Sequence, residues 1–153
     1  MKGLENKMNK MIEQIKEINP KAICIYKIGA FCHVYNRDAQ IISFLFDYKL
    51  KELGESHKEC GFPIETANKV TAKLQNSELN YLIIDRRNNY DVDEKEDYKE
   101  NNKYDKIYEK AKKYVNCKKR INNISQYLKD NLESENISKI LAKVEAVIYR
   151  MLL

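Results

Sequence analysis

The chain has 153 residues, of which 43% are hydrophobic and 33% are charged. This length fits one domain with at most a small appendage, and the apolar content excludes a disordered protein. No run of about 18 apolar residues occurs, which excludes a membrane-spanning helix, and no membrane partner is expected. The N-terminal segment MKGLENKMNK lacks the apolar stretch of a secretory signal. We therefore expect a soluble, helix-rich protein.

Cysteine usage indicates the compartment. The four cysteines include no C-x-x-C pair: Cys24, Cys32, Cys60 and Cys117. Buried free thiols are typical of the reducing cytoplasm, so we expect a cytoplasmic protein. Cys32-His33 and His57-x-x-Cys60 supply four candidate zinc ligands, but their spacing matches no zinc motif. We expect no bound metal and no other cofactor.

The net charge of +5 is unevenly distributed along the chain. Residues 85–100 hold seven acids and four bases, whereas residues 103–120 hold eight bases and two acids. A basic block of this kind suits a polyanionic partner, although on a helix such a run is more often a solvated face.

The N-terminal part of the chain predicts a helix followed by a β-hairpin. Residues 4–19 place apolar side chains at spacings of three and four, which predicts an amphipathic helix that ends before Pro20. Residues 23–36, with the sequence ICIYKIGAFCHVYN, predict a hairpin because two apolar runs flank Gly29. The missing Cβ of Gly29 permits the positive φ that a tight turn requires.

The second strand of this hairpin carries the triplet Phe31-Cys32-His33. Because side chains alternate between the two faces of a strand, Phe31, His33 and Tyr35 are expected to share one face. Cys32 then points away from His33, which excludes the hydrogen bond that a Cys-His nucleophile needs. No catalytic residue is predicted, and the protein is not expected to be an enzyme.

After the hairpin, the sequence alternates between helices and short extended segments. A helix with a broad apolar face is predicted over residues 38–53, ending at Gly54. A short extended segment follows at residues 61–65. Thr66 is the expected N-cap of a further helix over residues 67–78.

The remaining chain completes the predicted architecture. Residues 80–85, NYLIID, predict a second strongly apolar strand, so residues 1–88 are expected to form an α/β (α+β) domain with a mixed sheet and flanking helices. Residues 89–103 are highly charged without a helical or strand stripe and are interpreted as a solvated linker. Residues 104–153 predict two helices joined by a polar turn near residues 133–136, which together make a C-terminal helical hairpin.

Four segments of the first 85 residues follow one another in a distinctive order. They are PKAICIYKIGAF at residues 20–31, Arg37-Asp38-Ala39, Gly61-Phe62-Pro63 with Ala72-Lys73-Leu74 beyond it, and YLIID at residues 81–85. In this order and at this spacing they resemble the N-terminal mismatch-recognition domain of the MutS family of DNA mismatch-repair proteins. The resemblance covers roughly residues 5–85 and implies that family's α/β fold.

The resemblance also implies a site. In that family the turn is followed by Phe-x-Glu, in which the Phe stacks on an unpaired or mispaired base from the minor groove and the Glu hydrogen-bonds the same base. Phe31 occupies the Phe position, His33 replaces the Glu, and Ala30 replaces an acid before the Phe. An imidazole can donate to or accept from a base edge, but it is not an anionic acceptor. Nucleic-acid contact is therefore implied, with the family's mismatch discrimination left open. The alternative is that Phe31 packs under the N-terminal helix and His33 is a satisfied surface residue.

The basic block adds candidate phosphate contacts. Its tyrosines alternate with lysines, which suits a single strand or a duplex backbone, although tyrosines at helical spacing also fit a core stripe. The expected DNA-binding residues are Phe31, His33, Lys27, Lys112, Lys113, Lys118, Lys119 and Arg120. The expected ligand is DNA, with RNA as the alternative.

Two functions fit the sequence. The first is a non-catalytic nucleic-acid-binding module without ATPase activity, since no G-x-x-x-x-G-K-[ST] motif occurs. The second is a protein-interaction or oligomerisation module, in which the C-terminal helices mediate self-association or bind a protein partner. The apolar stripe of the last helix continues to Leu153, which favours the second function. The two can coexist, because a dimer would present two hairpins to one duplex.

Overall fold

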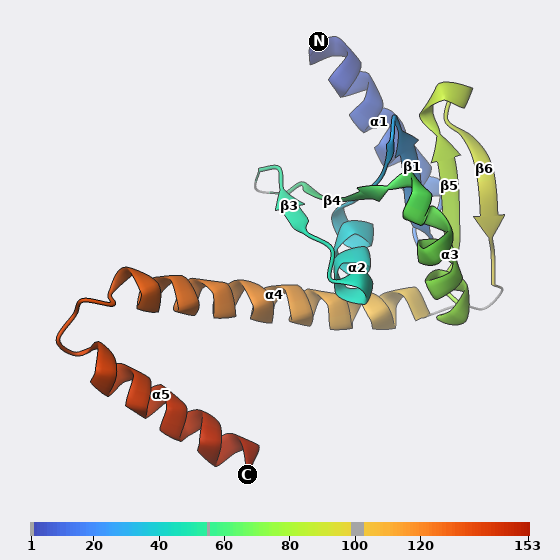
Figure 1. The fold of residues 1–153 in the computed structure, drawn as a ribbon. Coiled ribbons are helices and arrows are strands. Elements are labelled where there is room, and N and C mark those ends of the chain that lie inside the picture. The colour runs from blue at the N-terminus through green and yellow to red at the C-terminus, as the bar shows by residue number, and fades with distance from the viewer. Residues whose placement is uncertain (1, 55, 99–102) are drawn as a thin grey trace. The chain divides into compact units, whose positions relative to one another are not determined.

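The computed structural model describes residues 2–54, 56–98 and 103–153, and the chain divides into two compact units, residues 1–115 and 116–153. The first unit contains a six-stranded mixed sheet with helices on its faces, and the second is helical (Figure 1). The predicted mixed α/β fold with C-terminal helices is confirmed. Among the described helices, none has the length and apolar character needed to cross a bilayer.

The sheet has the strand order β3-β4-β2-β1-β5-β6. Its strands are β1 Ile23–Ile28, β2 Phe31–Tyr35, β3 Leu50–Glu52, β4 Lys58–Pro63, β5 Tyr81–Asp85 and β6 Asp91–Glu96. β1 and β5 run parallel, whereas the other neighbouring strands are antiparallel. β1 and β5 are apolar along most of their length because both of their faces are covered.

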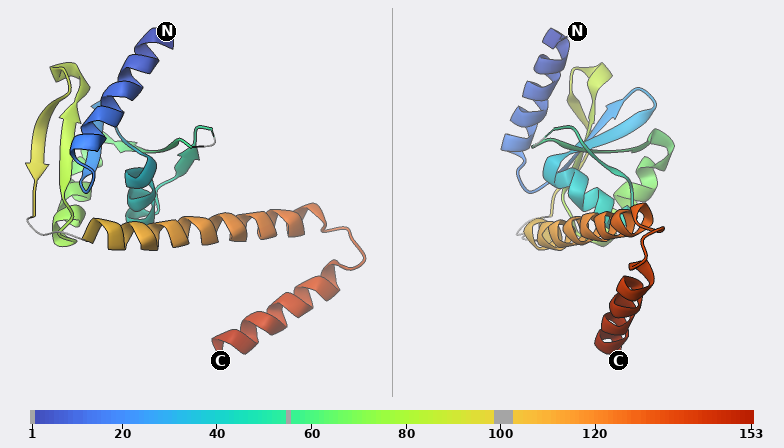
Figure 2. Two further views of the ribbon diagram at one scale, coloured as in Figure 1. Left: turned by 180° about the vertical axis from the view of Figure 1, so that it is seen from behind. Right: turned by 90° about the vertical axis from the view of Figure 1, so that its left-hand side faces the viewer.

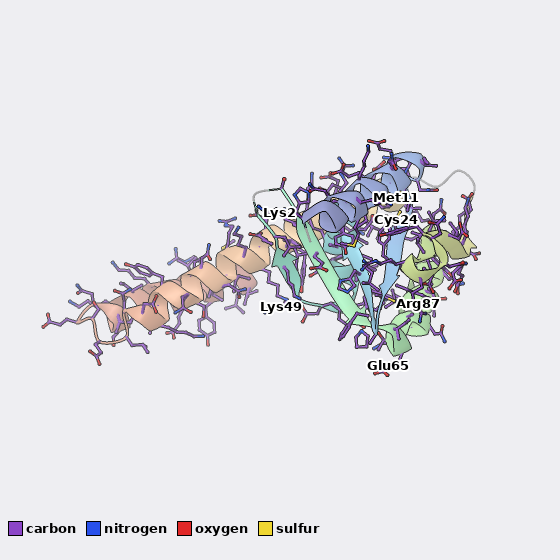
Figure 3. The ribbon with its side chains drawn as sticks, turned by 90° about the horizontal axis from the view of Figure 1, so that it is seen from above. Lys2, Met11, Cys24, Lys49, Glu65 and Arg87 are labelled. Atoms are coloured by element: carbon purple, nitrogen blue, oxygen red, sulfur yellow. The ribbon has the colours of Figure 1, made fainter. Side chains whose placement is uncertain are left out.

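Helices cover the two faces of the sheet unequally. The described helices are α1 Lys2–Ile18, α2 Asn36–Phe46, α3 Ala67–Asn76, α4 Lys103–Asp130 and α5 Ile137–Leu152, with short 3-10 turns at Ile64–Thr66 and Arg86–Asn88. α2, α3 and the first half of α4 contribute to the larger core, on one face (Figure 2). α1 lies alone on the other face, over the central strands (Figure 3).

The core under α1 is small and local. Ile12 of α1 is buried there with side chains from β1 and β5: Cys24, Tyr26, Leu82 and Ile84. β2 contributes only the partly buried Tyr35 to this core, while Phe31 at the other end of β2 keeps 50% of its surface exposed. α1 therefore covers the β1–β5 part of this face and leaves the β2–β4 part open.

The helix predicted over residues 38–53 is shorter than expected. α2 ends at Phe46, because Asp47 adopts the left-handed conformation with φ 55° and closes the helix. Residues Leu50–Glu52 instead pair with β4 and form β3. The apolar stripe predicted too long a helix, because Leu50 is part of the stripe but packs against the core from a strand.

The start of α3 also differs from the prediction. Thr66 is not a side-chain cap, because its backbone is already helical and its hydroxyl donates to the carbonyl oxygen of Pro63 at 2.8 Å. A 3-10 turn over Ile64–Thr66 leads directly into α3.

The linker predicted at residues 89–103 is wrong over Asp91–Glu96, which form β6. This strand is exposed along nearly its whole length, so it lacks the apolar alternation by which a strand is recognised. Its backbone pairing with β5 defines it, with an irregularity at the Ile83/Ile84 step. Residues 99–102 of the predicted linker lie outside the described residues.

The boundary between the two units also differs from the predicted one at residue 88. α4 is one continuous helix, and Tyr104 and Ala111 in its first half are buried in the larger core of the sheet. The first unit therefore extends to residue 115. The second contains the rest of α4, α5 and the turn between them, which begins after Asp130, close to the predicted position.

Three of the four cysteines, Cys24, Cys32 and Cys60, are buried free thiols, whereas Cys117 is exposed. Burial raises the pKa of Cys24 and of Cys60 to about 12, and it also raises the pKa of Cys32. These three thiols are therefore protonated and unreactive near neutral pH.

A buried carboxylate joins four elements of the first unit. Asp38, in the first turn of α2, accepts hydrogen bonds from Lys16 Nζ at 2.7 Å, from the hydroxyl of Tyr104 at 2.6 Å and from the backbone N–H of Cys24 at 3.0 Å. Lys16 Nζ also donates to the carbonyl oxygen of Ala22 at 2.7 Å. Burial, together with the neighbouring Asp38 carboxylate, raises the pKa of Tyr104, which remains a donor. This Asp38 cluster links α1, β1, α2 and α4.

We expect Asp38→Asn to lower the free energy of unfolding by roughly 2–4 kcal/mol, because it removes the charge partner of Lys16 inside the protein and one acceptor of the cluster. Chemical denaturation followed by tyrosine fluorescence measures this loss. Asp105→Asn is the matched control, since its pair with Lys21 is exposed and should contribute less than about 1 kcal/mol. Equal stability of the two variants would contradict a central role for Asp38.

Candidate nucleic-acid interface

The candidate site lies on the part of the sheet that α1 leaves open. We use the term open face for the residues of β2 and β4 that lie there: Phe31, His33, Tyr35, Glu59 and Gly61. Cys32 and Val34 are fully buried on the other face, so the alternation predicted for this strand is confirmed. In the β2–β4 register, His33 lies opposite Gly61 and Tyr35 lies opposite Glu59.

The turn before β2 positions the first residue of this face. Gly29 has φ 63°, a conformation that side-chain-bearing residues rarely adopt, and the chain reverses there from β1 into β2. The carbonyl oxygen of Ala30 accepts a hydrogen bond from Ile64 N at 3.0 Å, which ties the turn to the segment after β4. Phe31 follows directly and is half exposed. The alternative in which Phe31 packs under α1 is wrong, because Phe31 is half exposed and is not among the side chains that pack in the core under α1.

An aromatic row extends from Phe31 along the strand. The Phe31 and His33 rings meet edge to face with centroids 6.4 Å apart, and the His33 and Tyr35 rings are stacked at 6.5 Å. Tyr35 in turn contacts Tyr26 of β1 at 5.7 Å. Burial raises the pKa of Tyr35 to about 12, with a smaller contribution from Glu59, so its hydroxyl stays protonated. The row offers aromatic ring surface with hydrogen-bonding groups beside it.

His33 is held by a carboxylate that sequence reasoning missed. Its Nδ1 atom lies 2.5 Å from Oε1 of Glu59, and the side chains of His33 and Glu59 are 24% and 15% exposed. Gly61 lies opposite His33 in the register, and a Cβ built at Gly61 would lie 3.6 Å from His33 Nδ1, an ordinary van der Waals contact. Glu59 comes 26 residues after His33, so only the strand register could have revealed the pair.

The basic candidates do not gather on the open face. Lys27 lies opposite Cys32 in the β1–β2 register, on the other face of the sheet, and its Nζ is 2.5 Å from a carboxylate oxygen of Asp93. The hydrogen bond to Asp93 raises the pKa of Lys27. Lys112 and Lys113 are exposed on the half of α4 that packs against that same other face.

The other three basic candidates, Lys118, Lys119 and Arg120, are exposed residues of α4 in the second unit. Two basic residues that the sequence did not single out flank the open face instead. Lys51 lies opposite Glu59 in the β3–β4 register, and the charge of Arg86 acts to lower the pKa of Tyr35.

The tyrosines of the basic block belong to the core of the first unit. Tyr104 is buried, and Tyr108 is partly buried against the same core. Tyr114 meets Phe44 edge to face at 5.4 Å and donates its hydroxyl to Asp47 at 2.7 Å. Of the two interpretations of this stripe, the core stripe is correct, and these rings are not free to stack on bases.

The zinc hypothesis finds no support in the arrangement of the candidate ligands. Within residues 2–54, 56–98 and 103–153, no three His, Cys, Asp or Glu side chains are grouped as a metal site would require. Cys32 and Cys60 face the larger core, whereas the ring of His33 is on the open face with Glu59.

We expect Phe31→Ala to lower the free energy of unfolding by less than about 1 kcal/mol, because half of this ring is already in water. Phe62→Ala is the matched comparison, since Phe62 lies on the neighbouring strand and is 1% exposed; it should cost about 3–5 kcal/mol. Denaturation of both variants measures the difference. A loss at Phe31 as large as that at Phe62 would make Phe31 a core residue.

Comparison with known proteins identifies this unit. Residues 6–103 match the family model of MutS domain I, a span that covers more than half of the chain and includes all six strands and the open face. A search among curated proteins found no match.

Proposed function

The chain belongs to the MutS domain I family, which is the mismatch-recognition domain, and we propose that it is a non-catalytic nucleic-acid-binding module that contacts DNA through Phe31 and His33. RNA is the alternative ligand. The buried free thiols suit a reducing compartment, so we place the protein in the cytoplasm. An ATPase activity is not part of the proposal, because the sequence contains no P-loop.

One observation supports this function above the others: Phe31 is half exposed at the tip of a well-anchored hairpin, next to the His33 ring. Phe31 is the first ring of the aromatic row with His33 and Tyr35, so its exposed half is aromatic surface that a partner can cover. A base is a suitable partner, since stacking on an aromatic ring is worth about 1–3 kcal/mol.

The preferred DNA follows from the same energetics. Inserting an aromatic ring into a duplex costs unstacking energy, and this cost is smallest where a base is already mispaired or unpaired. A kinked duplex can then contact more protein surface. The open face should therefore favour bulged or mispaired DNA over a regular duplex.

The basic residues have a separate role in this proposal. Lys112, Lys113, Lys118, Lys119 and Arg120 supply positive charge for phosphate contacts that do not depend on sequence. Two of the basic candidates are already paired with carboxylates, Lys27 with Asp93 and Lys112 with Glu109.

We expect binding of a bulged duplex to weaken steeply with salt, with a slope of log K against log salt of about −3 to −5 if most of the five basic residues reach phosphates. Phe31→Ala should reduce the preference for bulged over regular duplex by roughly tenfold, since it removes one stacking contact. Fluorescence anisotropy at two salt concentrations, with regular, bulged, mispaired and single-stranded oligonucleotides, measures both effects.

A matched variant separates stacking from charge. Replacing Lys118, Lys119 and Arg120 by alanine should weaken binding to all of these DNAs alike and reduce the salt slope by up to about 3. Salt-independent binding, or a Phe31→Ala variant that binds every DNA like the parent, would overturn the proposed function.

A second function is favoured by the surface of residues 116–153. No side chain in this unit is buried, although it contains many large apolar residues. Its two helices line an apolar groove of about 530 Å³, formed by Ile121, Ile124, Ser125, Leu128, Lys129, Leu132, Ile137, Leu141, Val144 and Ile148. Two helices alone bury too little surface to be stable, and a second copy of the hairpin would complete a four-helix bundle. We propose that this unit mediates self-association, with docking of a different protein as the alternative.

We expect the parent chain to sediment as a dimer and Val144→Asp to weaken dimerisation more than about tenfold, because an unpaired carboxylate would be buried in the bundle. Analytical ultracentrifugation over a range of concentrations measures the association. Lys143→Asp is the control at the next, exposed position and should leave the dimer intact. A parent chain that is monomeric at every concentration would exclude self-association.

A further inference from the structure

The open face contains an acid although its sequence motif does not. The family's Phe-x-Glu has become Phe31-Cys32-His33, and the Glu59 carboxylate from the neighbouring strand lies 2.5 Å from His33 Nδ1. We propose that Glu59 is a positioning residue for base recognition: it fixes the His33 ring in the form that presents an unprotonated Nε2 to the base stacked on Phe31. This inference rests on the proposed DNA-binding function.

The form of the ring follows from the donor and acceptor inventory. A carboxylate only accepts hydrogen bonds, so the proton between Glu59 and His33 belongs to Nδ1. In a neutral imidazole the other nitrogen, Nε2, then carries a lone pair and accepts. A neutral histidine in water exchanges between its two tautomers, whereas Glu59 selects the neutral form with its proton on Nδ1 and its lone pair on Nε2. In this form Nε2 is a defined acceptor, which is the role that a Glu at position 33 would have filled directly.

The surroundings of the ring restrict its rotation. Gly61 lies beneath it, Phe31 meets it on one side at 6.4 Å between centroids, and Tyr35 stacks on the other side at 6.5 Å. The side chain of Glu59 is only 15% exposed, so water competes weakly for its oxygens. A ring held in this way meets a base in one orientation and loses little entropy on binding.

A fixed acceptor selects among bases. A displaced base presents its Watson–Crick edge to the protein. Thymine and guanine carry a ring N–H on that edge, which can donate to Nε2, whereas adenine and cytosine carry a ring nitrogen that is itself an acceptor. The His33–Glu59 pair should therefore favour an unpaired thymine or guanine over an unpaired cytosine or adenine.

The test compares two duplexes that differ only in one bulged base, thymine or cytosine. The parent should bind the thymine bulge roughly 5–10-fold more tightly than the cytosine bulge. Thymine donates one hydrogen bond to His33 Nε2, whereas the ring nitrogen of cytosine and Nε2 are both acceptors and leave each other unsatisfied. Glu59→Gln keeps the size of the side chain but can either accept from or donate to Nδ1. This variant should bring the ratio close to one. Glu65→Gln, the same charge change at an exposed site of the same unit, should leave the ratio unchanged.

The ring itself provides a second measurement. The sequence has only two histidines, so ¹⁵N NMR of the imidazole nitrogens at a pH where both are neutral gives a simple spectrum, assigned with His33→Ala. The parent should show His33 protonated at Nδ1, and Glu59→Gln should shift the proton toward Nε2. A merely structural role of Glu59 would not produce this change together with the lost base preference.

The outcomes separate this inference from the function on which it rests. If Phe31→Ala abolishes the bulge preference but Glu59→Gln changes neither the thymine-to-cytosine ratio nor the protonation of His33, the inference is wrong and the proposed function stands. If Phe31→Ala has no effect on any DNA, both are wrong. A changed ratio with a changed ring tautomer in Glu59→Gln supports both.

Discussion

The first unit depends on the satisfaction of one buried carboxylate. Asp38 can remain inside the protein only because three donors from different elements converge on it: Lys16 of α1, Tyr104 of α4 and the backbone N–H of Cys24 in β1. Loss of any one donor would leave the charge less well compensated in a medium of low polarity. The cluster therefore fixes the position of α1 on one face of the sheet relative to α4 on the other, and it does so near the start of the central strand.

The exposed site is a consequence of where α1 is anchored. Lys16 ties the last turn of α1 to Asp38 and to Ala22, just before β1, so the helix lies over β1 and β5 and does not extend over β2 and β4. The side chains of β2 that point to this face are left partly in solvent, whereas Cys32 and Val34 on the opposite face are fully buried. A well-packed core on one side and an uncovered strand on the other give a rigid platform for Phe31 and His33, which suits recognition better than a mobile loop would.

Sequence reasoning succeeded where the signal was local and apolar. The hairpin of β1 and β2 and the strand β5 are continuous runs whose burial dictates their residues, and the family resemblance rests on the same segments. It failed where backbone pairing alone defines the structure: β6 is an exposed edge strand, and β3 lies where an apolar stripe suggested more helix. Glu59 was missed for a related reason. Its contact with His33 depends on the register of β2 and β4, which no spacing along the chain encodes.

In the proposed DNA-binding function, the basic residues and the aromatic surface make separate contributions. The aromatic row is on the open face, whereas Lys112 and Lys113 belong to the half of α4 that packs on the opposite face. Lys118, Lys119 and Arg120 belong to the second unit. Phosphate contacts give affinity for any duplex, while base contacts give preference. Because the aromatic row and the basic residues lie on separate elements, a substitution in one should alter its own contribution and leave the other unchanged.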